Sequence, residues 1–199
     1  MIQQAIFFIN NIDFNWSLIE SLAVLFSILY VILASKENIW CWGAGAISAL
    51  LYVYICFLAG LYAETGLQVF YLIMAFYGFY NWNKKEQYLQ IKEWKSGKHL
   101  FILFTGAIMS LIMGYYLTNF SSAKMPITDS FTTVFSIIAT YMVVKKILEN
   151  WLYWIIINLT LVYLYFSRGL HLTSLLFIIY TVIAVIGYFS WLKKIEIDD

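Results

Sequence analysis

The sequence is poor in the residues that catalysis, metal binding and cross-linking require. It has two cysteines, two histidines, one proline and a single arginine in 199 residues. Cys41 and Cys56 lie fifteen residues apart on one predicted helix, which excludes a disulfide framework, and we expect both to be packing residues. His99 and His171 lie at helix ends on opposite sides, with no cluster of acids or cysteines around them. These shortages argue against an enzyme, and we expect no metal or cofactor site.

Charge is scarce as well. Charged residues make up 12% of the chain and hydrophobic residues 63%, whereas about a quarter of a soluble domain is charged. With Arg168 as its only arginine and a net charge of +1, the chain has no basic stripe for nucleic acid, so that class is excluded. The composition indicates an integral membrane protein. The first sixteen residues contain Asp13 but no lysine or arginine, so we expect no removable signal peptide.

Seven apolar runs are present, each long enough to cross a bilayer. We predict an all-α integral membrane protein with seven transmembrane helices. Pro126, the only proline, lies where it would start the fifth of them. The runs cover residues 17–35, 39–58, 65–82, 100–118, 128–144, 151–167 and 170–191.

Lysines are unevenly distributed among the connections between these runs. With the N-terminus outside, the inner connections hold ten of the twelve basic residues, and the outer ones hold only Lys124 and Arg168. Because cytosolic connections carry the excess of basic residues, we predict an outer N-terminus and a cytosolic C-terminus. The ten are Lys36, Lys84, Lys85, Lys92, Lys95, Lys98, Lys145, Lys146, Lys193 and Lys194.

The chain matches itself when it is shifted by 109 residues without a gap. A single register that aligns glycines, tryptophans and lysines is not expected by chance. We predict one transmembrane domain over 1–199, in which repeat one (17–85) and repeat two (128–194) are parallel and are joined by a linking helix (100–118). This 3+1+3 plan has SWEET-like pseudo-symmetry. The aligned pairs include Lys36 with Lys145, Trp42 with Trp151, Gly78 with Gly187, and Trp82 with Trp191.

The sixth run carries a polar and aromatic face. Trp151, Trp154 and Asn158 stand at positions i, i+3 and i+7, on one side of a helix. Asn158 lies roughly 10 Å along the helix from Trp151, at membrane depth, where an unpaired amide costs several kcal/mol. This face suits a flat ligand with hydroxyl groups or a positive charge, although Asn158 could also bond a neighbouring helix. The repeat partner of Asn158 is Ala49, and this asymmetry favours a functional role.

Three other tryptophans fall at the predicted cytosolic ends of runs. Trp42, Trp82 and Trp191 occupy positions where tryptophan usually anchors a helix at the membrane interface. We expect them to be anchors outside any site.

These motifs resemble the bacterial nicotinamide riboside transporters of the PnuC type. The resemblance spans Glu20 to Trp191. It is carried by the W-x-x-W-x-x-x-N helix of Trp151, Trp154 and Asn158 after Glu149-Asn150, and by Leu67-Gln68-Val69-Phe70 and Tyr77-Gly78-Phe79-Tyr80-Asn81-Trp82. It implies facilitated uptake of nicotinamide riboside across the bacterial inner membrane, with trapping by a cytosolic kinase, and it suggests a homotrimer.

Relatives of this kind that prefer thiamine or riboflavin are similar in sequence, so these vitamins remain alternative substrates. A membrane receptor that binds without transporting is a further alternative. We expect Trp151, Trp154, Asn158, Gln68 and Tyr71 to bind the substrate. Gln68 corresponds to Phe177 in the other repeat, which is a second departure from the symmetry.

Overall fold

The computed structural model of the chain is all-helical and describes residues 18–59, 61–83, 90–121, 125–167 and 169–198. Seven α-helices lie in this part, one on each predicted run, which confirms the predicted helix count and order. Residues 1–17, where no leader was expected, lie outside the described residues, as do Lys84, Lys85, Lys124 and Arg168. The helices are α2 (Leu18–Ser35), α3 (Cys41–Leu58), α4 (Tyr62–Trp82), α5 (Ser96–Phe120), α6 (Pro126–Val144), α7 (Asn150–Ser167) and α8 (His171–Asp198).

α5 and α8 extend furthest beyond the predicted apolar runs. α5 begins at Ser96 instead of residue 100, and α8 continues to Asp198 instead of ending at residue 191. Hydropathy marks where lipid contact stops, whereas a helix continues for as long as its residues favour it, as the lysines after Trp191 do. Pro126 is the first residue of α6, as expected, because proline lacks the N–H that this position leaves unpaired.

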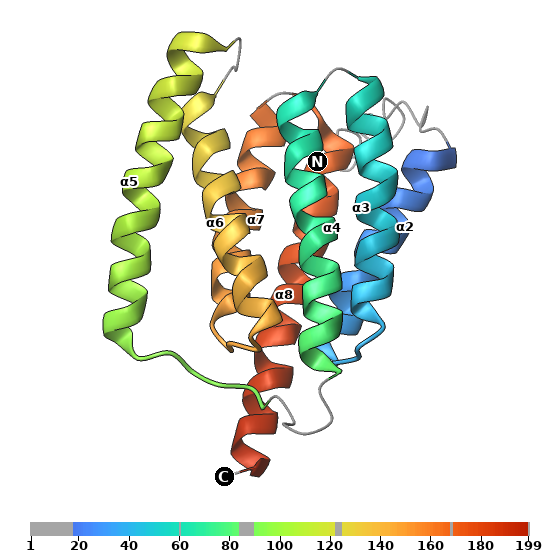
Figure 1. Cartoon of the computed structure of the whole chain (residues 1–199), viewed down its shortest axis with the longest axis vertical. Helices are drawn as coiled ribbons and strands as arrows, with labels where there is room; N and C mark the ends of the chain where they lie inside the picture. The colour runs from blue at the N-terminus through green and yellow to red at the C-terminus, as the bar shows by residue number, and fades with distance from the viewer. Residues whose placement is uncertain (1–17, 60, 84–89, 122–124, 168, 199) are drawn as a thin grey trace, which may run out of the picture.

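Six helices form a ring, and α5 stands outside it (Figure 1). Around the ring the neighbours are α2, α3, α4, α6, α7 and α8, and α8 packs back against α2. α5 packs on the outside of α6. The ring therefore consists of two groups of three helices, α2–α4 and α6–α8, which meet at α4 with α6 and at α8 with α2.

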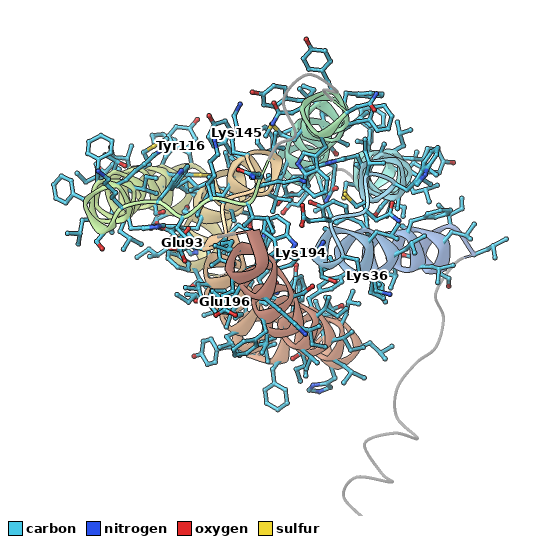
Figure 2. The ribbon with its side chains drawn as sticks, turned by 90° about the horizontal axis from the view of Figure 1, so that it is seen from below. Lys36, Glu93, Tyr116, Lys145, Lys194 and Glu196 are labelled. Carbon is cyan, nitrogen blue, oxygen red and sulfur yellow. The ribbon has the colours of Figure 1, made fainter. Side chains whose placement is uncertain are left out.

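One end of the bundle gathers the described lysines, and we call it the lysine-rich end. The turns 36–40 and 145–149, the segment 90–95 and the end of α8 all lie there (Figure 1). Figure 2 shows this end from below, with Lys36, Lys145 and Lys194 around it. The lysines are Lys36, Lys92, Lys95, Lys98, Lys145, Lys146, Lys193 and Lys194.

A tryptophan packs on a glycine in each group of helices, at positions 109 residues apart. The Trp42 indole lies so close to Gly78 that an added Cβ would be 2.3 Å from the ring. The Trp151 indole lies on Gly187 in the same way, where an added Cβ would be 2.8 Å away. Only glycine leaves room for the indole at either position.

The two groups are joined by a matching pair of tryptophan hydrogen bonds. Trp82 of α4 donates its indole N–H to the carbonyl of Val144, the last residue of α6, at 3.1 Å. Trp191 of α8 donates its indole N–H to the carbonyl of Ala34, near the end of α2, at 3.1 Å. Each third helix is thus tied to the end of the first helix of the other group.

A second matching pair of contacts joins the groups at mid-depth. The hydroxyls of Ser27 in α2 and Tyr180 in α8 form a hydrogen bond. Ser136 in α6 lies beside the Tyr71 hydroxyl of α4 at the other boundary between the groups. Each residue of the first contact is 109 positions from its counterpart in the second.

Five of the seven helices are long and apolar enough to cross a membrane by length and composition. The other two are α4 and α7, the helices that carry all five predicted site residues. Amide and indole side chains lower the mean hydropathy of a helix, so the residues that suggested a site also weaken the signal of a span. Both helices lie in the ring beside membrane-length neighbours.

The prediction that tryptophans anchor the helix ends was wrong for Trp42 and Trp191. Their exposed fractions are 2% and 0%, and Trp82 is half-buried beside them, so these rings pack between helices. A buried indole can stabilise the protein through ring contacts and its N–H bond, which hydropathy cannot distinguish from anchoring at a helix end. Trp40, 68% exposed, has the accessibility that an anchor needs. The prediction that Cys41 packs in the core is confirmed, since it is completely buried.

Candidate functional site

The predicted face of α7 lies inside the bundle. Asn158 is 4% exposed, and Trp151 is 2% exposed. Trp154 is half-buried and packs against both apolar clusters of the core, one of which contains residues of both helix groups. The burial of Asn158 and Trp151 and the half-burial of Trp154 are therefore consistent with the shared face that their spacing predicted.

Trp151 has one ring face already covered. Its indole lies on Gly187, and its ring meets that of Trp191 edge-on, at 5.4 Å between centroids and 87° between planes. α8 therefore occupies one side of the Trp151 indole. Stacking on a ligand would have to use the other face, whereas Trp154 is less enclosed.

The two predicted residues of α4 stand one turn apart. Gln68 and Tyr71 are both half-buried, and their spacing of three places them on the same side of the helix. The Tyr71 hydroxyl also lies beside Ser136 of α6, so it has a structural neighbour in addition to any ligand. α4 and α7 are the two neighbours of α6 in the ring, so the predicted residues of both helices lie on elements that flank α6.

Asn158 and Tyr71 lie at similar depth in the bundle. At 1.5 Å per residue, Asn158 is about 12 Å from the start of α7, and Tyr71 is about 17 Å from the end of α4. Both distances begin at the lysine-rich end. An amide from α7 and a hydroxyl from α4 therefore lie at comparable depth, near the middle of their helices.

Four tyrosines that the sequence did not single out gather with Tyr71 in this interior. Tyr71 lies near Tyr30 and Tyr165. Tyr52 lies near Tyr165 and Tyr180. The chain has 16 tyrosines without a distinctive spacing, so only the packing of α2, α3, α4, α7 and α8 brings these five together.

The aromatic ring that replaces Gln68 in the other repeat has a clear partner. Phe177 stacks on Tyr165 with 5.3 Å between centroids and 4° between planes. It also meets Tyr180 edge-on. The glutamine position thus corresponds to a stacked aromatic pair in the second half.

Two indole N–H groups in the core have no acceptor. The Nε1 atoms of Trp42 and Trp151 are buried and find no hydrogen-bond partner in the described part of the chain. An unpaired buried donor costs roughly 1–3 kcal/mol, so an acceptor at either place would stabilise the protein. Trp42 is thereby a further candidate that its expected role as an anchor concealed.

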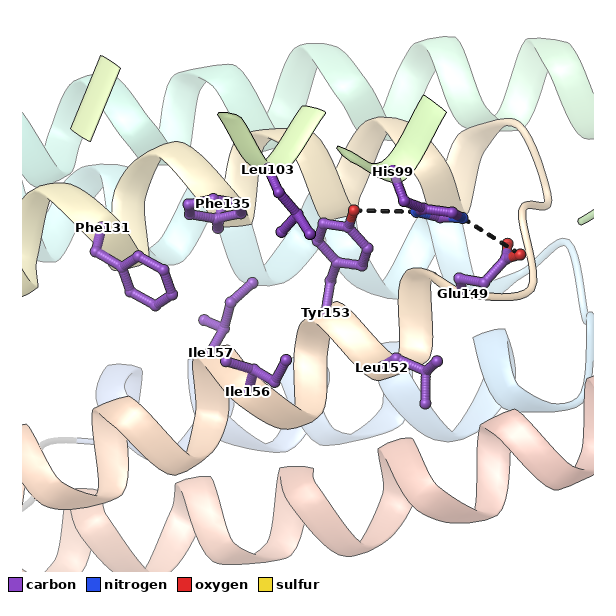
Figure 3. A pocket seen from close by; sticks show the side chains of 9 residues that line it. All are labelled: His99, Leu103, Phe131, Phe135, Glu149, Leu152, Tyr153, Ile156 and Ile157. Atoms are coloured by element: carbon purple, nitrogen blue, oxygen red, sulfur yellow. Dashed lines mark hydrogen bonds and ion pairs between the residues drawn. The ribbon is translucent and has the colours of Figure 1, made fainter. Parts of the chain in front are cut away.

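A separate hollow of about 260 Å³ lies between α5, α6 and α7 (Figure 3). His99 stands at one end of it, with Nδ1 3.1 Å from the Tyr153 hydroxyl and Nε2 3.4 Å from a Glu149 oxygen. The Glu149 carboxylate also accepts the Trp94 backbone N–H at 3.1 Å. The remaining lining is apolar, so these contacts attach α5 to α7 and do not form a site for a hydroxylated ligand. Sequence spacing alone did not connect His99 with Glu149.

No group of three or more metal-ligating side chains occurs among the described residues. In the described bundle, aromatic faces, amides and hydroxyls are available to a ligand at mid-depth, and helices of membrane-spanning length enclose them.

A ring of mostly apolar helices around buried polar and aromatic side chains is the architecture of a multi-pass membrane protein, and the family that matches it is one of transporters. Within that class, a family model described as nicotinamide mononucleotide transporter matches residues 17–193, and the chain belongs to this family.

Several named relatives are similar over nearly the whole chain. The nicotinamide riboside transporter PnuC of Escherichia coli (strain K12) is 29% identical, over 92% of this chain and 87% of the relative. The PnuC protein of Neisseria mucosa is 28% identical, over 97% of this chain and 78% of the relative. The riboflavin/roseoflavin transporter RibM of Streptomyces davaonensis is 20% identical, over 92% and 88%.

A solved structure is similar as well. The crystal structure of the vitamin B3 transporter PnuC superposes with a TM-score of 0.73 and 27% identity, covering 96% of this chain and 86% of that chain. The suspected family is thereby confirmed.

Proposed function

We propose that the chain takes up nicotinamide riboside across the bacterial inner membrane by facilitated diffusion, and that a cytosolic kinase traps the substrate by phosphorylation. The observation that carries this proposal is the buried face of Trp154 and Asn158 at mid-depth in α7. An indole attracts a cationic pyridinium ring, and an amide can both donate to and accept from ribose hydroxyls. Relatives named as nicotinamide riboside transporters support the same substrate.

The family description names the mononucleotide, but the charges in this chain favour the nucleoside. Within the described helices, lysines occur only near the lysine-rich end, at Lys98 in the first turn of α5 and at Lys193 and Lys194 late in α8. A phosphate dianion at mid-depth would therefore have no cation to pair with, and burying an unpaired charge is very costly. We expect nicotinamide mononucleotide to bind far more weakly than the riboside. Equal affinity for the two would overturn this choice of substrate.

We further propose the 3+1+3 plan with parallel repeats, an outer N-terminus and a cytosolic lysine-rich end. The repeated Trp–Gly packing and the matching bonds between the helix groups support repeats over 17–85 and 128–194, joined by 100–118. The concentration of lysines at one end supports the orientation. A reporter that is active only in the periplasm, fused after the C-terminus, should stay inactive.

A homotrimer is the assembly that the family resemblance implies, and we propose it here. Native mass spectrometry of the purified protein should give three times the chain mass of 23.3 kDa.

The deciding experiment measures binding and uptake with the same protein. Liposomes containing the wild type should accumulate nicotinamide riboside in preference to thiamine and riboflavin. By calorimetry, Trp154→Ala and Asn158→Ala should each weaken binding by about 1–3 kcal/mol, or roughly ten- to a hundredfold. Trp40→Ala, which removes an exposed indole, is the matched control and should bind like the wild type.

Each other outcome points to a specific alternative. Unchanged affinity in both site variants would mean that the substrate binds elsewhere. Preferred uptake of riboflavin would favour riboflavin transport, the function for which the relative RibM is named. Binding without movement across the liposome membrane would favour a receptor.

A further inference from the structure

A buried ion-pair cluster lies at the lysine-rich end, outside the proposed binding site. The Glu37 carboxylate accepts Lys146 Nζ at 2.6 Å on one oxygen and Lys194 Nζ at 2.9 Å on the other. The side chains of Glu37 and Lys146 are only 7% and 6% exposed, whereas that of Lys194 is 44% exposed. Glu37 thus holds one buried and one partly solvated lysine.

The cluster joins the two groups of helices at their point of pseudo-symmetry. Glu37 follows α2, and Lys146 follows α6, 109 residues later. Both have a left-handed backbone, with φ of 56° and 51°, so they occupy equivalent turns. A residue that touches its own counterpart lies at the two-fold axis relating two units. Two identical charges would repel there, but the repeats differ at this position and the contact is attractive.

Aromatic rings lie next to the ion-pair cluster. Lys146 Nζ lies 4.8 Å from the centre of the Trp82 ring, and Trp82 contacts Trp191 at 6.2 Å between centroids. These are the tryptophans that bond across to Val144 and Ala34. Between the mid-depth residues and the lysine-rich end, the boundary of the two groups is therefore filled by indoles and closed by ion pairs.

We propose that Glu37, Lys146 and Lys194 form the gate at the cytosolic end of the transport path, shown here closed. This proposal rests on the proposed transport function and orientation. Separating the two groups of helices at this end would pull Glu37 away from both lysines and open a way out for the substrate. A buried ion pair suits such a gate, because the loss of attraction on opening is offset by rehydration of both charges.

The first test uses a native thiol beneath the gate. Cys41 is 0% exposed, and Lys146 lies near its thiol. In protein carrying Cys56→Ala, a maleimide should label Cys41 slowly. Glu37→Gln removes the carboxylate that neutralises the buried Lys146, which disfavours the closed state by about one decade or more in equilibrium constant, so labelling should rise about tenfold or more. Glu93→Gln removes an exposed carboxylate at the same end and should change nothing.

Unchanged labelling in Glu37→Gln would overturn the gate. If that variant fails to fold, Lys194→Gln, which removes only the half-exposed partner, replaces it and should raise labelling to a smaller extent.

The second test locks the gate. The chain with Cys41→Ala, Cys56→Ala, Glu37→Cys and Lys146→Cys is bridged by a bifunctional methanethiosulfonate, since two long side chains in contact leave their backbones too far apart for a disulfide. Bridging should abolish nicotinamide riboside uptake by liposomes, reductant should restore it, and calorimetric binding should persist throughout.

The control bridge joins Glu93→Cys to Lys146→Cys in the same background. These segments already pair, since Lys92 N–H bonds the Lys146 carbonyl at 2.9 Å, so bridging them should leave uptake intact. Full uptake through the Glu37–Lys146 bridge would overturn the gate. Failure of the wild-type protein to transport nicotinamide riboside would instead count against the proposed function.

Discussion

The two groups of helices share a frame and differ in what fills it. Trp42 on Gly78 in the first group repeats as Trp151 on Gly187 in the second, and each tryptophan meets a further indole edge-on, at 5.3 Å and 5.4 Å. The contacts that set the distance between neighbouring helices have therefore been kept.

Large and small side chains are exchanged between equivalent positions. Trp154 in α7 corresponds to Gly45 in α3, where an added Cβ would be 3.0 Å from the ring of Tyr30. Tyr30 corresponds in turn to Ala139, which is completely buried. The first half thus places its ring on the first helix of the repeat and the second half places it on the second helix. Comparable core volume is filled in both, but only the second half puts an indole one turn from Asn158.

The largest effect we expect comes from breaking the frame at Trp191. Trp191→Ala removes a completely buried indole and its bond to Ala34, and it should lower the free energy of unfolding by about 3–5 kcal/mol. Thermal unfolding in one detergent measures this change. Trp40→Ala is the control and should have little effect. If Trp191→Ala is as stable as the wild type, the indole contributes nothing to joining the two groups.

Next comes the glycine contact. Gly78→Ala should destabilise the protein by about 1–3 kcal/mol, because the new methyl group overlaps the Trp42 ring. Gly187→Ala should cost less, since its Cβ would lie at 2.8 Å instead of 2.3 Å. Gly66→Ala in the same helix meets nothing within 4 Å and should be neutral or slightly stabilising in the same unfolding assay. The reverse order for Gly78 and Gly187 would contradict the packing described.

A smaller effect compares the two mid-depth contacts. Tyr180→Phe removes the hydrogen bond to Ser27, Tyr71→Phe removes the hydroxyl beside Ser136, and each should lower stability by about 0.5–1.5 kcal/mol. Only Tyr71→Phe should also weaken nicotinamide riboside binding in calorimetry, since Tyr71 is a proposed ligand residue. Equal losses of affinity in both variants would assign Tyr71 a purely structural role.

The smallest effect is on acid stability. Burial alone would raise the Glu37 pKa, but hydrogen bonds from Lys146 and Lys194, together with their charges, hold it below its ordinary value of 4.5. A lowered carboxyl pKa contributes stability above the unfolded value, and that contribution is lost as the pH falls from about 4.5 through the lower folded value. Glu37→Gln should therefore flatten the fall of melting temperature in this range. Glu93→Gln should retain the wild-type dependence of melting temperature on pH. If Glu37→Gln also retains it, the ion pairs of Glu37 do not contribute to acid stability.

Much of the architecture followed from the sequence alone. Apolar runs predicted seven helices in the right order, because burying a backbone in lipid requires helices of a set length. Trp154 and Asn158 were placed on one face by helical period, and the structure buries Asn158 and half-buries Trp154. Patterns along a single helix are local, so they can be read without knowing the neighbours.

Contacts between helices were decided only by the tertiary structure. The sequence assigned Trp42 and Trp191 to the membrane interface, yet both are buried, because position at a helix end does not reveal which neighbour covers a side chain. The ion pair of Glu37 with Lys146 was hidden for the same reason, since 109 residues separate partners that meet only when the two groups close into a ring. Helical period determines which residues share a face, and the packing of helices distant in sequence determines what that face touches.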